Sequence, residues 1–391
     1  MPNDNCIVIL LTGRIDSSNV QDVEAKILEQ LNGNEDKEMV FDASGLDYIS
    51  SAGLRMLMRF RKRFSNTMTV EDVSPEVYDI FETTGFTELL TVRKRRRTVD
   101  VTGCEVIGRG FYGTVYRLDQ DTIIKLYDTV DSLPMIENEK RMAKLAFLKG
   151  IPTAISYDIV KVSDSYGSVF ELLNAKTFND LIIAEPDRAD DIIKQYVDFI
   201  KLVHKTVVLP HELPSARDSY LKQTDAIREY IGEKRYQGLK ALIERSDDEN
   251  GVVHGDFQMK NVMLVDDEPM LIDMDTLSRG NPVFDLAGLF VTYRMFPEDE
   301  YDNSMKFLGI DNDMAEHIWD SILRYYFDTD DADKLKVFEN RIRLVAAVRF
   351  MYILVISDLK NNELAPVRFK HTNEHIDELL EKVDDISCSA G

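Results

Sequence analysis

The most informative stretch of this chain is His254-Gly-Asp256-Phe-Gln-Met-Lys-Asn261, and Leu271-Ile-Asp273 follows it at the end of a later apolar run. An Asp and an Asn therefore lie on a loop between two short apolar segments, and a second Asp ends the strand that follows. This set suits phosphoryl transfer from a metal-bound nucleotide. One carboxylate can accept the proton of the attacking hydroxyl, while amide and carboxylate oxygens hold Mg²⁺ against the phosphates.

A glycine-rich stretch lies upstream, at Gly108-Arg-Gly110-Phe-Tyr-Gly113-Thr-Val115. Apolar segments at 101–107, 115–118 and 122–127 predict three strands, so the glycines belong to a hairpin turn. The dinucleotide-binding use of such a run is excluded, because it requires a strand, a tight turn and then a helix. A glycine-rich hairpin is typical of the flap that covers nucleotide phosphates in kinases, although an ordinary flexible hairpin has the same pattern.

The strand predicted at 122–127 contains Lys125, a cation within an apolar run, and the helix that follows contains Glu137 and Glu139. An acid on this helix can pair with the Lys and hold it on the α- and β-phosphates. A solvated Lys and a chance acid in a charged helix are the alternative.

Together these motifs resemble the aminoglycoside phosphotransferase and choline kinase group of small-molecule kinases over roughly residues 100–391. The resemblance includes Gly150-Ile-Pro-Thr153, Ile-Asp-x-Asp and Asn281-Pro-x-x-Asp285-Leu-Ala, and His-Gly-Asp stands where most protein kinases have His-Arg-Asp. It implies an α+β bilobal protein-kinase-like fold, with a small β-rich N-lobe at 99–175 and a mostly helical C-lobe at 176–391.

The resemblance also implies ATP and Mg²⁺ as cofactors, with Asp256 as the catalytic base, Asn261 and Asp273 as magnesium ligands and Lys125 as the phosphate contact. It favours Glu139 as the partner of Lys125, because of the spacing from this residue to Gly150. Residues that we expect to support the loop are His254, Asp275 and Asp285. The other candidates for nucleotide binding lie in the flap and in the hinge that we expect near 169–177, and they are Gly108, Gly110, Gly113, Val115 and Glu171.

The chain before residue 100 has another character, because predicted strands at 6–11 and 38–42 alternate with helices at 20–31, 52–64 and 75–83. Ser18 and Gln21 match a capping box, and Ser74-Pro75 opens the last helix. Alternation of this kind predicts a small α/β layer domain at 1–95, joined by a linker at 96–98.

This segment contains Phe41-Asp42-Ala-Ser44-Gly45-Leu-Asp47-Tyr-Ile-Ser50-Ser51-Ala52-Gly53-Leu54-Arg55. The stretch resembles the STAS domain of anti-sigma-factor antagonists over about residues 3–92, and the resemblance places the serine phosphorylated by a partner kinase at Ser51. Ser50 replaces the Asp that often precedes it. A helix N-cap is the structural alternative for Ser51, and a helix N-terminus also favours a phosphate.

Composition limits the partners. Residues 1–98 contain 13 Lys plus Arg and 16 Asp plus Glu, a net charge of −3, so the remainder carries −20 of the total −23. Such an acidic unit argues against a nucleic-acid partner. No segment has the pattern of a membrane span or a secretion signal, and three scattered cysteines favour the cytoplasm. The basic block Arg93–Arg97 fits a solvated linker.

The leading hypothesis is an ATP- and Mg²⁺-dependent kinase that phosphorylates a hydroxyl of a small molecule, with a STAS-like module that binds a protein partner or regulates the enzyme. The alternative is a signalling protein that phosphorylates a protein Ser such as Ser51. A pseudokinase is disfavoured because no catalytic position is missing. In the C-lobe, helices are predicted at 189–204, 219–246, 316–327 and 332–361. Four acids have two open interpretations, contacts to a cationic substrate or a polar loop, and they are Glu298, Asp299, Glu300 and Asp302.

Overall fold

The computed structural model describes residues 6–32, 34, 37–64, 68–109, 113–127, 132–173 and 175–388. The chain forms two compact units. The first contains the residues up to Asp100 together with Ile159–Asp164, and the second contains Val101–Asp158 and the residues from Ser165 onward.

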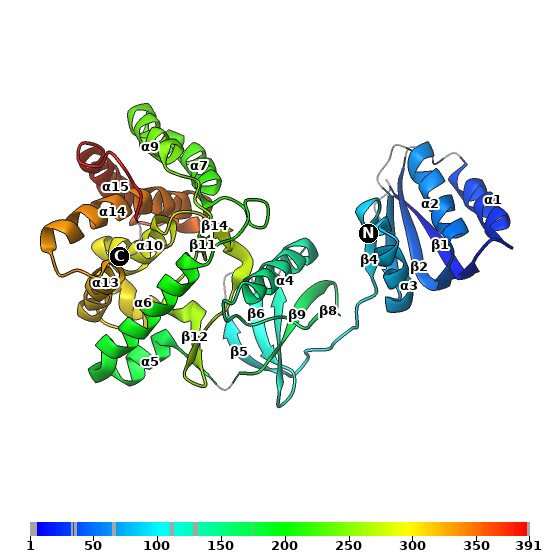
Figure 1. Cartoon of the computed structure of the whole chain (residues 1–391), viewed down its shortest axis with the longest axis horizontal. Coiled ribbons are helices and arrows are strands. Elements are labelled where there is room, and N and C mark those ends of the chain that lie inside the picture. Colours follow the sequence, from blue (N-terminus) through cyan, green and yellow to red (C-terminus); the bar gives the residue numbers. More distant parts are fainter. Residues whose placement is uncertain are drawn as a thin grey trace. The chain divides into compact units, whose positions relative to one another are not determined.

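The first unit is an α/β layer domain around a parallel four-stranded sheet of order β1-β2-β3-β4 (Figure 1). Parallel neighbours require crossover connections, and helices provide them. Buried side chains of the strands and helices, among them Phe41, Leu57 and Val70, form a core of their own. The elements are β1 (Cys6–Ile15), α1 (Val20–Leu31), β2 (Glu38–Ile49), α2 (Ser51–Arg63), β3 (Met68–Val73), α3 (Pro75–Thr83), η1 (Phe86–Glu88) and β4 (Thr91–Lys94).

The helix caps of this unit differ in part from the prediction. Ser18 donates its hydroxyl to Asp16 Oδ1 at 2.6 Å, and α1 begins after Asn19 without a side-chain cap, so the predicted capping box is wrong. The cap of α2 is Ser50, whose hydroxyl accepts the Ala52 N–H at 3.2 Å. Ser51 is instead the first residue of α2, and its side chain is exposed.

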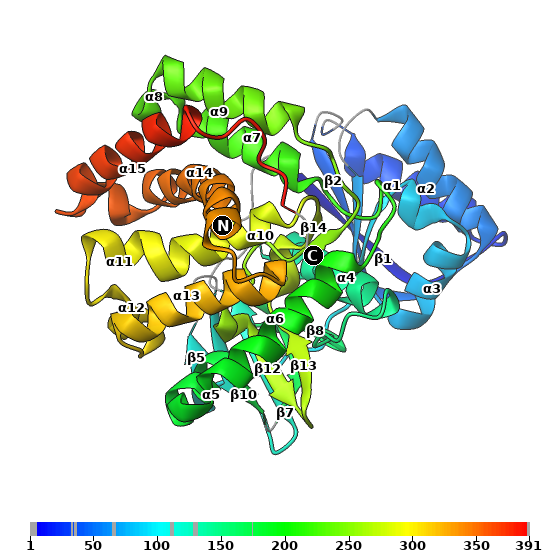
Figure 2. The same ribbon diagram turned by 60° about the vertical axis from the view of Figure 1, so that its left-hand side comes forward.

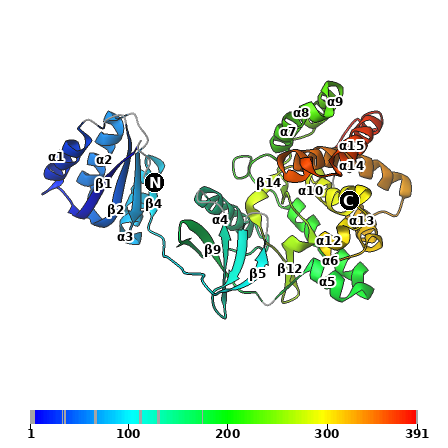
Figure 3. The same ribbon diagram turned by 180° about the vertical axis from the view of Figure 1, so that it is seen from behind.

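A five-stranded sheet of order β5-β6-β7-β9-β8 and the helix α4 come next in the chain (Figure 3). Four of the strands and α4 belong to the second unit, whereas residues 159–162 of β8 belong to the first. The first strand starts at Glu105 and not at the predicted residue 101, because the Cys104 N–H closes a turn on the Val101 carbonyl at 3.1 Å. The elements are β5 (Glu105–Arg109), β6 (Gly113–Arg117), β7 (Thr122–Tyr127), α4 (Leu133–Leu148), β8 (Asp158–Val162) and β9 (Ser165–Glu171).

Helices dominate the rest of the second unit, and its remaining short strands form a three-stranded and a two-stranded sheet (Figure 2). The helix predicted at 219–246 is divided into three pieces, which meet at Ile227 and at Gly232. Gly232 has φ of +77° and ends the middle piece. Its longer helices are α5 (Phe178–Ala184), α6 (Ala189–Lys205), α7 (Ala216–Ala226), α9 (Glu233–Arg245), α10 (Val283–Phe290), α13 (Asn312–Phe327), α14 (Ala332–Ile356) and α15 (Ala365–Leu380). The shorter elements are β10 (Lys176–Thr177), η2 (Pro186–Arg188), α8 (Arg228–Ile231), β11 (Val252–Val253), η3 (Met259–Asn261), β12 (Val262–Val265), β13 (Glu268–Leu271), η4 (Met274–Thr276), β14 (Ser278–Arg279), the π-helix η5 (Val291–Met295), α11 (Phe296–Asp299), α12 (Asn303–Leu308) and η6 (Asp358–Asn361).

One core runs through the second unit, from Met142 on α4 to Cys388 near the C-terminus. In this core Phe257, on the loop that contains Asp256, packs against the rings of Tyr196, Phe199 and His204 on α6. Among the described helices, none combines the length and the apolar character needed to cross a membrane.

Candidate functional site

Asp256 lies on the loop after β11, and two side-chain amides hold its carboxylate. Gln258 Nε2 donates to Oδ1 at 3.1 Å and to Oδ2 at 3.0 Å, and Asn261 Nδ2 donates to Oδ2 at 2.9 Å. Asn261 Nδ2 also contacts the Asp256 carbonyl oxygen at 2.9 Å. The amide nitrogen of Asn261 faces Asp256, so its amide oxygen is the side-chain atom that can bind a cation.

Asp285, at the start of α10, accepts hydrogen bonds from the same loop. The His254 N–H donates to Oδ2 at 2.7 Å, and the Gly255 N–H donates to Oδ1 at 2.6 Å. His204 Nε2 lies 3.0 Å from Oδ2. Burial alone would raise the pKa of Asp285, but the hydrogen bond from His204 and the electrostatic interactions with His204 and His254 hold it below its ordinary value. A buried carboxylate thus fixes the backbone that leads into Asp256.

Gly255 gives this loop its turn. Its φ is +85°, and a Cβ there would lie 2.9 Å from both Cβ and the carbonyl oxygen of Thr276. The Gly of His-Gly-Asp is therefore required by backbone conformation and by space in this chain.

His254 is fully buried and links the loop to the end of β13. The Asp256 N–H donates to His254 Nδ1 at 3.3 Å, so Nε2 carries the ring hydrogen and donates it to the Ile272 carbonyl at 3.2 Å. Thr276 Oγ1 donates to the His254 carbonyl at 2.7 Å. These contacts suit a residue that positions the loop.

Lys125 on β7 lies between two carboxylates. Its Nζ is 3.2 Å from Glu139 Oε1 on α4 and 2.5 Å from Asp273 Oδ1 beyond β13. Burial alone would lower the pKa of Lys125, but the charges of Glu139 and Asp273 raise it above its ordinary value. The Tyr127 hydroxyl donates to Glu139 Oε2, so the buried Glu139 carboxylate is held by two donors.

Asp273 precedes η4 directly and Asp275 lies within it. The region around both residues is rich in carboxylates. Asp273 has φ of +63°, a left-handed backbone conformation that is uncommon outside Gly. Burial raises the pKa of Asp275 to about 7, and the charges of Asp273 and Glu139 add to the shift. A divalent cation fits this excess of negative charge. No group of three or more His, Cys, Asp or Glu set to hold a metal occurs in the described ranges, but Mg²⁺ commonly takes one or two protein oxygens together with phosphates and water.

The flap and hinge candidates have separate placements. A Cβ at Gly113 would lie 2.0 Å from the Leu126 carbonyl oxygen, so β6 requires a glycine there, whereas Gly108 has room for a side chain. Val115 pairs with Lys125 across β6 and β7. Gly110 lies outside the described residues. Glu171 is exposed at the end of β9, where it pairs with Thr122.

Three residues of this region were missed by the sequence reasoning. Tyr127 follows Lys125 by two positions, and side chains at that spacing share a strand face, so alternation offered a signal. Gln258 had no such signal. Tyr196, whose hydroxyl donates to the Phe257 carbonyl, lies on α6, about 60 residues before the loop, and only the tertiary fold brings it there.

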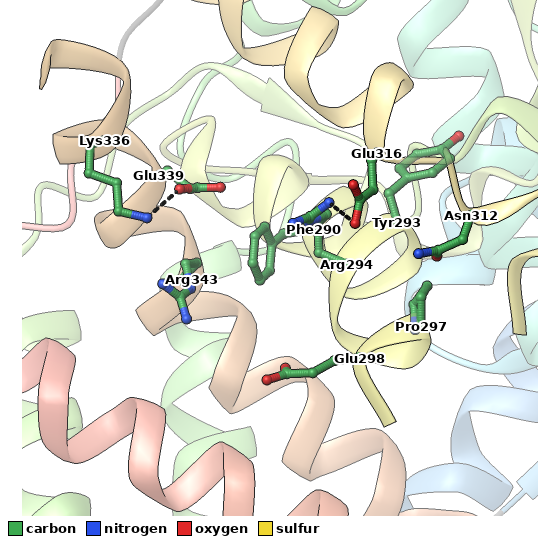
Figure 4. A pocket seen from close by; sticks show the side chains of 10 residues that line it. All are labelled: Phe290, Tyr293, Arg294, Pro297, Glu298, Asn312, Glu316, Lys336, Glu339 and Arg343. Carbon is green, nitrogen blue, oxygen red and sulfur yellow. Dashed lines mark hydrogen bonds and ion pairs between the residues drawn. The ribbon is translucent and has the colours of Figure 1, made fainter. Parts of the chain in front are cut away.

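A cavity of about 360 Å³ lies among η5, α11, α13 and α14 (Figure 4). Most of its charges are paired within the chain, with Arg294 on Glu316 and Lys336 on Glu339, both at 2.9 Å. Its lining residues are Phe290, Tyr293, Arg294, Pro297, Glu298, Asn312, Glu316, Lys336, Glu339 and Arg343.

The four acids weighed as substrate contacts form ion pairs inside the second unit. Three face α15, since Glu298 lies 3.1 Å from His375, Asp299 lies 2.6 Å from His371, and Glu300 lies 2.7 Å from Arg368. The fourth, Asp302, lies 3.0 Å from Lys306. Their contacts favour the attachment of α15 over the binding of a cationic substrate.

Comparisons with known proteins match the N-terminal part of the chain and the rest of it to two different families. Residues 2–100 match the family model of the STAS domain, and residues 103–316 match that of the phosphotransferase enzyme family. A protein of Bordetella bronchiseptica that carries the name anti-sigma factor antagonist BtrV is 31% identical over 96 residues, which cover 24% of this chain and 82% of that protein.

Two solved structures are similar at low identity. A thermostable mutant of aminoglycoside phosphotransferase APH(4)-Ia has 12% identity and a TM-score of 0.49, covering 71% of this chain and 94% of its own. Aminoglycoside phosphotransferase APH(3'')-Id from Streptomyces rimosus, with ADP and streptomycin, has 16% identity and a TM-score of 0.43, covering 65% and 93%. Residues 2–100 make up a STAS domain. The model of the phosphotransferase enzyme family spans more than half of the sequence, so this chain belongs to that family.

Proposed function

We propose that the chain transfers the γ-phosphoryl group of Mg²⁺-bound ATP to a hydroxyl of a small molecule. The observation that carries the proposal is the contact of Lys125 with both Glu139 and Asp273, beside an Asp256 carboxylate that Asn261 holds. These groups come from four separate segments of the chain, and their convergence supplies a cation for phosphates, oxygens for a metal and a base.

In this mechanism Lys125 would contact the α- and β-phosphates, and Asn261 and Asp273 would provide the protein oxygens for Mg²⁺. Magnesium, when bound, neutralises charge on the phosphate oxygens. Asp256 orients the acceptor hydroxyl and accepts its proton as the hydroxyl oxygen forms a bond to the γ-phosphorus. The bond from that phosphorus to the β–γ bridging oxygen breaks, and ADP leaves with this oxygen.

The test is the Asp256→Asn chain, which keeps the shape of the side chain and loses the base. We expect the rate of acceptor-dependent ADP release to fall about 10²- to 10⁴-fold, while ATP affinity, measured by calorimetry, is largely retained. The acceptor is first found by screening hydroxylated amines, sugars and nucleosides. Asp266→Asn changes an exposed carboxylate at the turn between β12 and β13 and serves as the control. Turnover that survives in Asp256→Asn contradicts the assignment.

A second candidate function is phosphorylation of a protein Ser, with the STAS domain as the module that meets the partner. One observation favours Ser51 as an acceptor: it is exposed at the first residue of α2, and Ser50 already caps the helix. A phosphate at this position gains from the unpaired N–H groups of the helix N-terminus.

Incubation of the chain with γ-labelled ATP separates the two functions. If a protein Ser is the acceptor, label enters the wild-type protein and is lost in Ser51→Ala, while the neighbouring Ser44→Ala serves as the control. Label that never enters the protein, together with acceptor-dependent ADP release, favours the small molecule.

A further inference from the structure

We propose that Gln258 is a positioning residue that aims the carboxylate of Asp256, and this inference rests on the proposed function. Its Nε2 donates to both carboxylate oxygens, at 3.1 Å and 3.0 Å. Asn261 Nδ2 contacts one of the same oxygens at 2.9 Å. Two amides therefore fix the plane of a group whose direction decides whether it can take a proton from an acceptor.

The chemistry of the amide suits this task. A neutral donor orients a carboxylate without cancelling its negative charge, whereas a Lys or Arg at this distance would form an ion pair and weaken the base. Gln258 shares the task with Asn261, but Asn261 also has an oxygen for the metal. Within the described part of the chain, the side chain of Gln258 forms hydrogen bonds only with Asp256.

The oxygen of the Gln258 amide, unlike its nitrogen, is not hydrogen-bonded to any described residue. Gln258 Oε1 is buried and has no hydrogen-bond partner within the described residues. An amide turned over would place this oxygen against the two Asp256 oxygens, where it would be repelled, so the observed orientation is the one that the carboxylate selects. A buried unpaired carbonyl destabilises the fold, and unsatisfied buried groups of this kind occur at functional sites.

Removal of the Gln258 amide should therefore affect stability and activity in different directions. Gln258→Met keeps the length of the side chain and removes both the donor and the unpaired oxygen. We expect Tm to rise or stay unchanged, while kcat falls about 10- to 100-fold, the loss expected from a misaligned base. The KM for ATP should stay within about twofold, because the side-chain hydrogen bonds of Gln258 in the described ranges go to Asp256 and not to Lys125 or Glu139. Gln258→Glu keeps the shape but sets an oxygen against Asp256, so kcat should fall further.

Gln223 on α7 provides the matched control. It is buried, and its Oε1 also lacks a hydrogen-bond partner among the described residues. Gln223→Met should shift Tm in the same direction and leave kcat unchanged, since among the described residues no hydrogen bond joins its side chain to the loop of Asp256.

The experiment measures Tm by thermal unfolding, and kcat and KM by ADP release from Mg²⁺·ATP, for the full-length chain and the three variants. A Gln258→Met chain with wild-type kcat overturns the positioning role, and so does one whose Tm and kcat fall together, because that result indicates a structural role. A wild-type chain that turns over no ATP with any acceptor or with water overturns the proposed function itself.

Discussion

At the scale of single residues, the loop depends on groups that the motif names and on groups that it does not. The order of motifs predicted the contact of Lys125 with Glu139, and their atoms lie 3.2 Å apart, although a role in phosphate binding stays a prediction. Tyr127 donates one hydrogen bond to Glu139, and Gln258 donates to both carboxylate oxygens of Asp256. Such bonds depend on side-chain direction across the fold, which spacing along the chain does not encode.

Gly255 offers a prediction at this scale. Gly255→Ala places a Cβ 2.9 Å from Thr276 at a φ of +85°, so we expect the free energy of unfolding to fall by about 1–3 kcal/mol. Activity should fall as well, because the strain is released by moving the loop of Asp256. Urea unfolding followed by circular dichroism measures the change.

The control for this prediction is Gly288→Ala on α10, where the nearest atom to an added Cβ is 4.0 Å away. An Ala inside a helix should hold or raise stability by up to about 1 kcal/mol. If both variants unfold at the same urea concentration as the wild type, the argument for a glycine in the His-Gly-Asp turn is wrong.

At the scale of elements, local patterns located most helices and strands, and tertiary contacts decided several of their ends. The bounds of α1 and α3 are those that the sequence predicted. By contrast, β2 runs to Ile49, seven residues beyond its predicted end, because it pairs with β1 along this length. Sheet pairing extends a strand past the region where alternation is visible.

The contacts of α15 could not be predicted from the sequence, because they join segments that are far apart in the chain. Its bases His371, His375 and Arg368 pair with acids of the segment after η5, about 70 residues earlier in the chain. From the sequence these acids were open to two interpretations, because nothing local shows that their charges are already balanced. Docking of one helix thus changed the interpretation of an acidic cluster from substrate site to structural contact.

At the scale of the whole molecule, the two units have separate cores. Every buried member of the first core lies between Ile9 and Leu90, and the second core begins at Met142. The sequence predicted this division from the change between alternating strand–helix patterns and kinase motifs. The exact boundary, placed at residues 96–98, stays a proposal, and it can be tested without any knowledge of the acceptor.

We expect residues 1–100, expressed alone, to fold and unfold cooperatively, because the parallel sheet, its helices and its complete core are included. Thermal unfolding followed by circular dichroism should show a single sigmoidal transition. Residues 1–64 provide the control, since they lack β3, α3 and β4 and expose the side of β2 that pairs with β3. A fragment of residues 1–100 that melts without a transition would mean that its core depends on the rest of the chain, and the STAS domain would then be a part of the kinase fold instead of a module that can bind a partner by itself.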